Sequence, residues 1–142
     1  MVEVFTIGYE GRSVDELIRE LKERRIKVLV DIRAITSSRK KGFSKNQLDE
    51  ELRKAGLVYL GMKELGTPDE VRRAYKAGGS IEELRRSYGA YLDAQGEKIE
   101  ELKRHLRERR SALFCYEKDV KKCHRYVLAK RLEQDGFEIK NI

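Results

Sequence analysis

Short apolar runs alternate with segments of helical periodicity along the whole chain, and this alternation limits the fold more than any other feature. The apolar runs occupy residues 2–8, 27–32, 57–60, 112–116 and 137–140. Each has the length of a strand, and apolar residues recur every three or four positions in the intervals between them. Consecutive parallel strands need a long crossover, usually a helix. The sequence therefore predicts an α/β domain with a mostly parallel sheet of four or five strands and helices on both faces.

Helix-start signals between the apolar runs support this fold. Ser13 and Glu16 have the spacing of a capping box, in which each side chain bonds the other residue's backbone. Ser44 precedes a second helical segment. Thr67 and Pro68 combine a capping residue with a proline suited to the first helical turn. Each signal follows an apolar run, so strand and helix succeed one another three times in the first half of the chain.

The second half begins with a long helical stretch. The pattern stays helical from about residue 69 to 109, which predicts a helical insertion broken near Gly89 or Gly96. A last helix is predicted to be capped by Asp119 and to carry His124 on its apolar stripe. The chain has no Pro-rich or Ser-rich linker, so we expect residues 1–142 to form one domain.

Composition narrows the class of protein. The chain is 40% charged and 39% hydrophobic, and its apolar residues are periodic, which indicates a folded protein. Three Gln and two Asn accompany these charges, a balance typical of proteins from hot environments, so we expect a thermophilic source. The N-terminal residues lack the basic start and long apolar stretch of a signal peptide, so we expect a cytoplasmic protein that binds no membrane.

The net charge of +7 is concentrated in two segments. Residues 33–45 contain five Lys/Arg and no acid, and residues 103–131 contain eleven Lys/Arg against three acids. Both segments adjoin the carboxyl end of a predicted strand, where open parallel sheets bind their ligands. A positive crevice attracts polyanions, which makes nucleic acid or a phosphorylated small molecule the expected partner. For the helical part of the second segment, a solvated helix face explains the charge equally well.

Three acids follow predicted strands and are expected to meet at one edge of the sheet. Asp31 ends the second apolar run, with Arg33 on the same side by strand periodicity. A carboxylate kept ionised by that arginine can stabilise a cationic transition state or orient water. The alternative is a structural Asp–Arg pair. Glu117 and Glu64 follow two other strands, and together with Asp31 they are the predicted catalytic carboxylates.

The loop after the second strand mixes cations with hydroxyls and an aromatic ring, a combination used to bind phosphates and bases. Tyr9 follows the first strand and is expected to overhang the same crevice. We therefore predict that these side chains bind nucleic acid, together with two residues of the last helix: Tyr9, Arg33, Ser38, Arg39, Lys40, Lys41, Phe43, Ser44, His124 and Arg125.

The two cysteines fit no metal motif. Cys115 and Cys123 are eight residues apart, and the chain has neither a CxxC pair nor a Cys/His quartet, so we predict no metal, no cofactor and no structural disulfide. Cys115 is interpreted as a core residue. Cys123, at a predicted helix start, is a possible nucleophile. His124 is equally compatible with a catalytic base and with a buried residue that orients a neighbour.

Several of these residues also form a recognisable set. The chain resembles the domain-of-unknown-function 488 family over nearly its whole length, in an archaeal or thermophilic version, through the following motifs: Thr6-Ile7-Gly8-Tyr9, Val30-Asp31-Ile32-Arg33 with Ser38-Arg39 and Gly42-Phe43-Ser44, Glu64-Leu65-Gly66, and Cys115 to Glu117 with Cys123-His124-Arg125. The resemblance implies a compact α/β domain and, from some archaeal relatives, removal of damaged pyrimidines from DNA. Tyr9 stands where many relatives have His, and the basic stretch 39–41 is stronger than usual.

Three functions are compatible with these observations. The first is a glycosylase-type DNA repair enzyme that hydrolyses the N-glycosidic bond of an oxidised or deaminated pyrimidine, with a carboxylate at the sugar and cations on the phosphates. In this reading Tyr9 or Phe43 stacks on the base. The second is a cysteine-dependent enzyme acting on a phosphorylated or thiolated small molecule. The third is a DNA-binding or RNA-binding module without catalysis.

Overall fold

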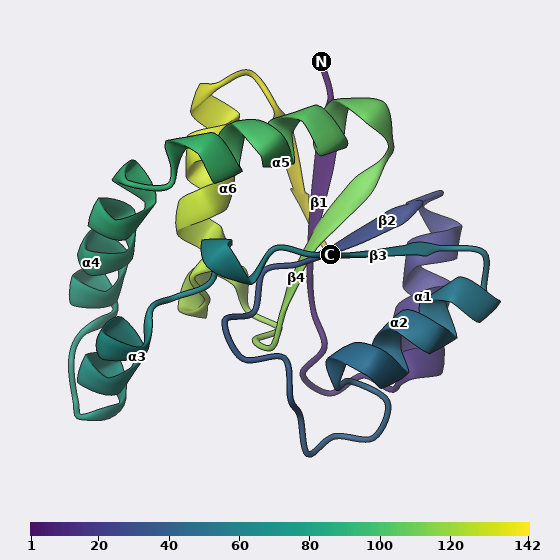
Figure 1. Cartoon of the computed structure of the whole chain (residues 1–142), viewed down its shortest axis with the longest axis horizontal. Coiled ribbons are helices and arrows are strands. Elements are labelled where there is room, and N and C mark those ends of the chain that lie inside the picture. Colours follow the sequence, from purple (N-terminus) through teal and green to yellow (C-terminus); the bar gives the residue numbers. More distant parts are fainter.

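A sheet of five parallel strands forms the centre of the molecule (Figure 1). The computed structural model describes residues 1–121 and 123–142 in full. The strands are arranged in the order β3-β2-β4-β1-β5, with these bounds: β1 Glu3–Gly8, β2 Val28–Asp31, β3 Val58–Gly61, β4 Ser111–Cys115 and β5 Glu138–Asn141. All five predicted strands are present, shifted by one residue or so at their ends. The predicted α/β class is confirmed.

Six α-helices and two short 3₁₀ helices connect the strands. Their bounds are α1 Val14–Glu23, α2 Lys45–Lys54, η1 Lys63–Leu65, α3 Asp69–Lys76, α4 Ile81–Asp93, α5 Gly96–Glu108, η2 Val120–Lys122 and α6 Arg125–Gln134. The capping box predicted at the start of α1 is present in full, because Ser13 accepts from the Glu16 amide and Glu16 from the Ser13 amide. The helical insertion predicted at about 69–109 is α3, α4 and α5.

Of two predicted helix boundaries, one is confirmed at one of its two alternatives and the other is wrong. The break in the insertion lies between Asp93 and Gly96, next to the predicted Gly96, whereas Gly89 is inside α4, where its carbonyl accepts a hydrogen bond from Arg131. Asp119 caps η2 and not the long helix, which begins only at Arg125. The physical reason is that η2 and α6 have separate hydrogen-bond systems, which apolar periodicity alone does not distinguish.

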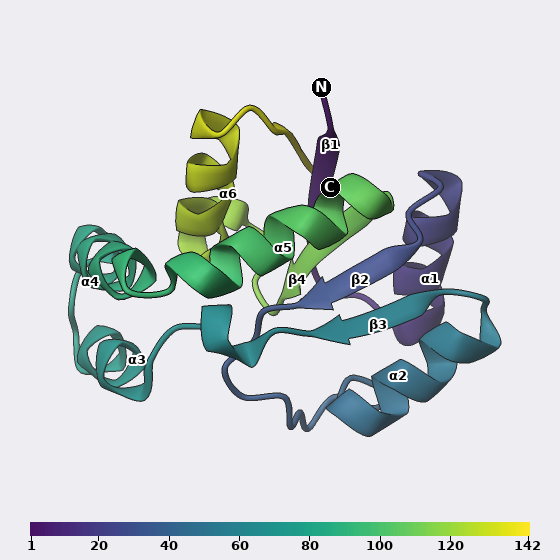
Figure 2. The same cartoon turned by 45° about the horizontal axis from the view of Figure 1, so that its top comes forward.

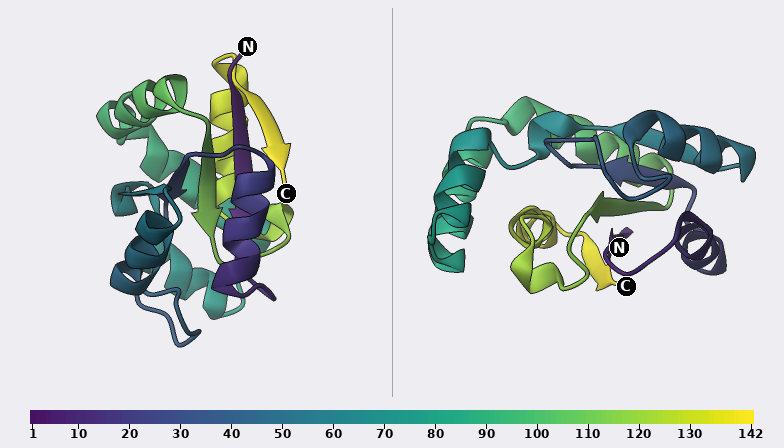
Figure 3. Two further views of the ribbon diagram at one scale, coloured as in Figure 1. Left: turned by 90° about the vertical axis from the view of Figure 1, so that its right-hand side faces the viewer. Right: turned by 90° about the horizontal axis from the view of Figure 1, so that it is seen from below.

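Both faces of the sheet are covered by helices. Leu17 and Leu21 of α1 pack with α2 against one face, on strand residues such as Phe5, Leu29 and Phe114. On the other face α4, α5 and α6 pack against the alternate strand residues. Strands and helices together form one apolar cluster there, which includes Val4, Val28, Val30, Leu113, Tyr88, Leu92, Ile99, Leu102, Leu106, Leu128 and Leu132. The two clusters follow the two-residue period of the strands. Figure 3 shows the helices arranged around the twisted sheet.

The strand order places a crevice at the carboxyl ends of β1, β2 and β4. The chain moves in one direction across the sheet from β1 through β2 to β3, and in the opposite direction from β3 through β4 to β5. Right-handed crossovers that run in opposite directions put their helices on opposite faces. The loops after neighbouring strands therefore part at this edge, and such switch points are where open α/β sheets bind ligands.

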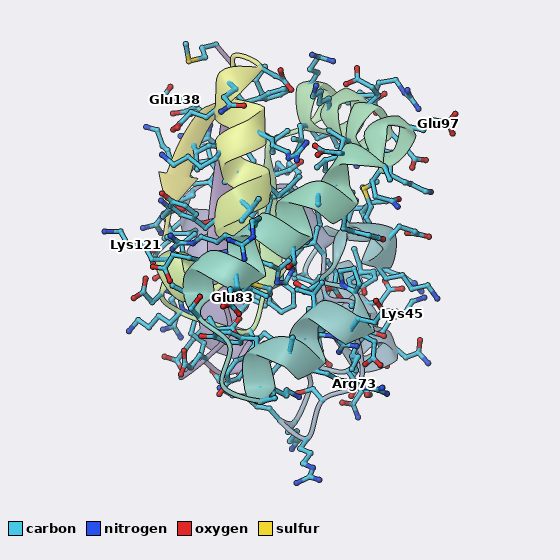
Figure 4. All side chains as sticks on the ribbon, turned by 90° about the vertical axis from the view of Figure 1, so that its left-hand side faces the viewer. Lys45, Arg73, Glu83, Glu97, Lys121 and Glu138 are labelled. Carbon is cyan, nitrogen blue, oxygen red and sulfur yellow. A yellow bond between two sulfur atoms is a disulfide. The ribbon has the colours of Figure 1, made fainter. Side chains whose placement is uncertain are left out.

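Helices α3 and α4 stand beside the sheet, on the side away from α1 and α2 (Figures 1 and 2). They pack chiefly on each other, and every residue of α3 is at least partly exposed. Seen from this side, Arg73 of α3 and Glu83 of α4 project outward from the pair (Figure 4). The opposite side of α3 forms a wall of the crevice.

Candidate functional site

A cavity of about 290 Å³ opens at the predicted crevice. The loop after β1 contributes Tyr9, the loop after β2 contributes Arg33 to Ile35, the end of β4 contributes Cys115 to Glu117, and His124 closes the floor. Helix α3 adds the opposite wall. The lining residues are Tyr9, Arg33, Ala34, Ile35, Thr67, Arg72, Tyr75, Lys76, Leu84, Cys115, Tyr116, Glu117 and His124.

Two cysteines meet beside this cavity. Cys115 is the last residue of β4 and Cys123 follows η2, and their sulfur atoms form a disulfide. The prediction that the cysteines do not pair was therefore wrong, because the turn through η2 brings the chain back over the end of β4, which spacing does not reveal. Cys115 is among the residues that line the cavity and Cys123 is not, although both side chains are almost completely buried. The sulfur that faces a ligand is thus that of Cys115 and not that of Cys123.

Arg125 is buried directly behind the disulfide. Its Nη1 donates to Cys115 Sγ at 3.0 Å and to the carbonyl of Glu117 at 2.6 Å, and its Nη2 donates to the carbonyl of Lys118 at 3.2 Å. Burial lowers the pKa of the guanidinium to about 10, which leaves it charged at neutral pH. A buried cation in contact with a sulfur atom stabilises the thiolate form of that cysteine once the disulfide is reduced.

His124 is held in one orientation. Its Nε2 lies 3.0 Å from the carbonyl oxygen of Ile32, so this nitrogen carries the hydrogen and donates it. The ring packs edge-on against Tyr88. Burial lowers the pKa of His124 to about 4, so the ring is neutral at physiological pH. Its Nδ1 therefore presents a lone pair 3.7 Å from Cys123 Sγ.

Glu117 provides the carboxyl group of the cavity. Burial raises its pKa, while the nearby Arg125 opposes that rise. Its Oε2 lies 4.0 Å from Cys115 Sγ. The position depends on Gly8 at the end of β1, because a Cβ atom there would overlap the carbonyl of Glu117. Glycine at this point thus allows the loop after β4 to cross the end of β1.

Asp31 has a different setting. The side chain is fully buried, and its two oxygens pair with Nε and Nη2 of Arg33 at 2.9 and 2.8 Å. The backbone amide of Arg33 donates at 3.0 Å and Tyr59 Oη at 2.5 Å. With four donors around it, the carboxylate has little capacity left for a substrate. The geometry is that of the structural Asp–Arg pair, the alternative that the sequence left open.

Glu64 lies outside the cavity. It belongs to η1, where its carbonyl accepts a hydrogen bond from Tyr91. Its charge acts on Lys98 of α5, whose pKa is raised chiefly by Glu101 and further by Glu64. The three predicted catalytic acids therefore do not meet: Glu117 lines the cavity, Asp31 is buried beside it, and Glu64 faces α5.

The loop of residues 33–45 divides into buried and exposed parts. Phe43 is fully buried, stacked on Tyr9 at 4.4 Å between centroids, and its carbonyl accepts from Arg33. Tyr9 also stacks on Phe114, so both rings belong to the core and leave no free face for a base. Periodicity could not reveal this, because Phe43 lies in a loop.

Polar residues of the same loop hold it together. Ser38 and Ser44 exchange hydrogen bonds, and Ser44 does so in place of capping α2 with its side chain. Lys40 Nζ donates to the carbonyl of Tyr9 at 3.1 Å. Arg39 and Lys41 are exposed, as is Lys45 at the start of α2, so these cations could contact a phosphate.

Helix α3 supplies site residues that the sequence did not indicate. Arg72, Tyr75 and Lys76 line the cavity opposite Cys115. Arg72 also pairs with Asp69 at 2.8 Å, and within the described part of the chain its Nε is buried without a hydrogen-bond partner. Their spacing at positions i, i+3 and i+4 places them on one helix face, but only the tertiary fold shows that this face borders a cavity.

One group of side chains has the composition of a metal site. The sulfur atoms of Cys115 and Cys123 and a ring nitrogen of His124 lie within 4.8 Å of one another. The residues come from both sides of η2, so no short ligand motif signals the group.

No helix in the described residues is long and apolar enough to cross a bilayer.

Fold and site together define a doubly wound α/β protein with a disulfide beside the pocket at its switch point. The chain belongs to the family described as Domain of unknown function DUF488, whose model matches residues 13–132. No curated protein and no solved structure matches the chain.

Proposed function

We propose that the chain reduces a small anionic disulfide by thiol–disulfide exchange at Cys115 and Cys123. The observation that carries this proposal is the bond between the two sulfur atoms at the wall of a cationic cavity. Of the three functions compatible with the sequence, this is the cysteine-dependent enzyme on a thiolated substrate, with Cys115 as the attacking residue because Cys115 borders the cavity.

The reaction begins from the reduced chain. The Cys115 thiolate, stabilised by Arg125, attacks one sulfur of the substrate R–S–S–R′, which breaks that S–S bond and releases R′S⁻. Cys123 then attacks Cys115 Sγ, releases RS⁻ and forms the Cys115–Cys123 disulfide. The substrate gains two electrons and the two cysteines lose them. A dithiol reductant from solution returns the cysteines to the reduced form.

His124 and Glu117 have separate parts in this scheme. The lone pair of His124 Nδ1, 3.7 Å from Cys123 Sγ, can take the proton of the second thiol as it attacks. Burial raises the pKa of Glu117, so its carboxyl keeps a proton to higher pH than a free glutamate does. In the protonated form it can donate a proton to the leaving thiolate. Arg72 and Lys76 supply the positive wall for the substrate's anionic group.

Trapping the intermediate tests the proposal. A reduced Cys123→Ser chain mixed with a chromogenic dianionic aryl disulfide should keep a covalent adduct on Cys115, detected by mass spectrometry. Cys115→Ser should form no adduct and release no coloured thiolate. An adduct confined to Cys123 would reverse the assignment, and turnover by the Cys115→Ser/Cys123→Ser chain would remove the proposal.

A charge comparison tests the substrate class. Arg72→Ala/Lys76→Ala should slow reduction of the dianionic disulfide by about tenfold and leave reduction of a neutral hydroxyalkyl disulfide within about twofold. Arg73→Ala, on the outer face of the same helix, is the matched control and should change neither rate. Equal loss with both substrates would show that these residues do not select for charge.

The setting of Glu117 favours one further candidate function, that of an enzyme that excises damaged pyrimidine bases from DNA. A half-buried carboxyl with a raised pKa could act on an N-glycosidic bond, and the exposed Arg39 and Lys41 of the loop after β2 could contact phosphates. Duplexes with oxidised or deaminated pyrimidines, incubated with the chain and then treated with alkali, should break at the damaged base. Glu117→Gln should abolish cleavage and Cys115→Ser should not, which separates the two candidates. Salt-sensitive binding without cleavage would favour a DNA-binding or RNA-binding module.

A further inference from the structure

We propose that the reduced chain binds one Zn²⁺ ion through Cys115, Cys123 and His124. This goes beyond the proposed reduction of disulfides, because it assigns a metal site that neither the sequence motifs nor the family model indicates. Two thiolates and an imidazole are ligands that zinc prefers over magnesium or calcium. Their three ligand atoms already lie within 4.8 Å of one another.

The hydrogen bonding of His124 is the second, independent observation. A histidine that binds a metal usually donates its other ring N–H to a carbonyl or carboxylate, which fixes the ring and the tautomer. His124 does this through Nε2 and the carbonyl of Ile32 at 3.0 Å. The free lone pair is consequently on Nδ1, the nitrogen that faces the cysteines. With the N–H held on Nε2 by this contact, no proton on Nδ1 has to be displaced by a metal ion.

The spacing of the ligands agrees with a tetrahedral ion. Zinc–sulfur bonds of about 2.3 Å and zinc–nitrogen bonds of about 2.0–2.1 Å place neighbouring ligand atoms roughly 3.5–3.8 Å apart. His124 Nδ1 and Cys123 Sγ are 3.7 Å apart. The Cα atoms of the two cysteines are 7.6 Å apart. Once the sulfur atoms are no longer bonded, small side-chain rotations can therefore separate them around an ion.

The fourth position faces the cavity. Glu117 Oε2 lies 4.0 Å from Cys115 Sγ, so either this carboxylate or a water can complete the tetrahedron. Three protein ligands with one position open to a pocket are the arrangement of catalytic zinc sites. The guanidinium of Arg125, 3.0 Å from Cys115 Sγ, donates a hydrogen bond to the coordinated thiolate. Its positive charge disfavours ions held by charge alone, which adds to the preference for a thiophilic metal.

Metal titration of the whole chain tests the site. The chain is reduced with a phosphine, freed of metal and titrated without oxygen, with Zn²⁺ alone against a chromogenic chelator. We expect one equivalent to bind. Co²⁺ alone should give thiolate-to-cobalt charge-transfer absorption with the strong visible bands of a tetrahedral ion. The oxidised chain should bind neither ion, because both sulfur atoms are then committed to the disulfide.

Variants identify the ligands. Cys123→Ser and His124→Gln should weaken zinc binding by more than the roughly 10–100-fold that loss of an outer-shell partner costs. His105→Gln, on α5 and outside the cavity, is the matched control and should bind like the parent. Circular dichroism establishes that each variant is folded, and Cys115→Ser provides a third ligand variant should His124→Gln not fold.

Two results would overturn the site. One is a reduced parent chain that binds no more zinc than Cys115→Ser/Cys123→Ser, and the other is a His124→Gln chain, shown to be folded, that keeps full affinity. Disulfide turnover without zinc binding would remove the metal site and leave the proposed function intact. Zinc binding without disulfide turnover would remove the proposed function and leave the metal site intact.

Discussion

The ends of β2 and β4 lie side by side at one edge of the sheet, and each has an acid and an arginine near it, Asp31 with Arg33 and Glu117 with Arg125, yet the two groups have opposite characters. Around Asp31 every carboxylate oxygen has donors and the pair with Arg33 is sealed from solvent. Around Glu117 the carboxyl borders a cavity, and in the described residues the buried Nε of Arg125 has no hydrogen-bond partner. A satisfied cluster stabilises a fold, whereas an unsatisfied one can bind a ligand.

The largest expected effect comes from breaking the hydrogen-bonded cluster around Asp31. Asp31→Asn leaves Arg33 as an uncompensated buried charge, so the free energy of unfolding should fall by about 3–5 kcal/mol. Glu117→Gln should change it by less than about 1 kcal/mol, because its carboxyl is partly solvated and loses a destabilising charge. Urea denaturation of the two variants measures the contrast. A stable Asp31→Asn chain that lacked all activity would instead support the catalytic carboxylate predicted from the sequence.

The second effect concerns how the stability of the fold depends on protonation of His124 in acid. The pKa of His124 is about 4 in the folded chain against 6.5 unfolded, so the unfolded chain takes up the proton first as pH falls. Stability contributed by the neutral ring is complete above pH 6.5 and is lost between pH 6.5 and about 4, by roughly 3 kcal/mol. His124→Gln should flatten this part of the stability profile, while His105→Gln should keep it.

The third change tests the close contact between Gly8, at the end of β1, and the loop after β4. Gly8→Ala places a Cβ atom against the carbonyl of Glu117, so the loop after β4 must move. We expect a loss of about 1–3 kcal/mol, as for overpacking of a dense interior. Gly96→Ala, where a Cβ atom has open space at the start of α5, is the control and should be neutral or stabilising. Equal thermal denaturation of both variants would contradict the close approach.

Much of the fold could be predicted from the sequence, because its signals are local. All five strands and the capping box at Ser13 depend on residues within one turn or one strand. The break before Gly96 was one of two predicted positions, whereas the separate helix η2 was missed, because hydrogen-bond partners and not apolar periodicity define it. The strand order itself has no local signal, since it depends on which strands pack together across the whole chain.

The site was less predictable for the same reason. The sequence indicated Glu117 after a strand, Cys115 within that strand and His124 on a helix, but the pairing of Cys115 with Cys123 depends on the return of the chain through η2. Asp31 and Glu117 look alike in sequence, each following a buried strand. The structure distinguishes them, because Asp31 is paired with Arg33 and accepts from the Tyr59 hydroxyl of the neighbouring strand β3, whereas Glu117 borders the cavity.

The smallest expected effect comes from removing the Tyr59 hydroxyl. Tyr59→Phe takes one of four donors from the Asp31 carboxylate and leaves the ring in place, so unfolding should become easier by about 1 kcal/mol. The change lies outside the cavity, and disulfide turnover should stay within about twofold of the parent. Denaturation and turnover measured on one preparation test both statements. If turnover fell severalfold while stability held, the cluster after β2 would take part in the chemistry, and the division between a structural and a reactive strand end would fail. The division has a physical basis. A partly buried charged group with spare hydrogen-bond donors, as around Glu117, tolerates the loss of one donor, whereas the buried Asp31–Arg33 pair does not tolerate the loss of either partner.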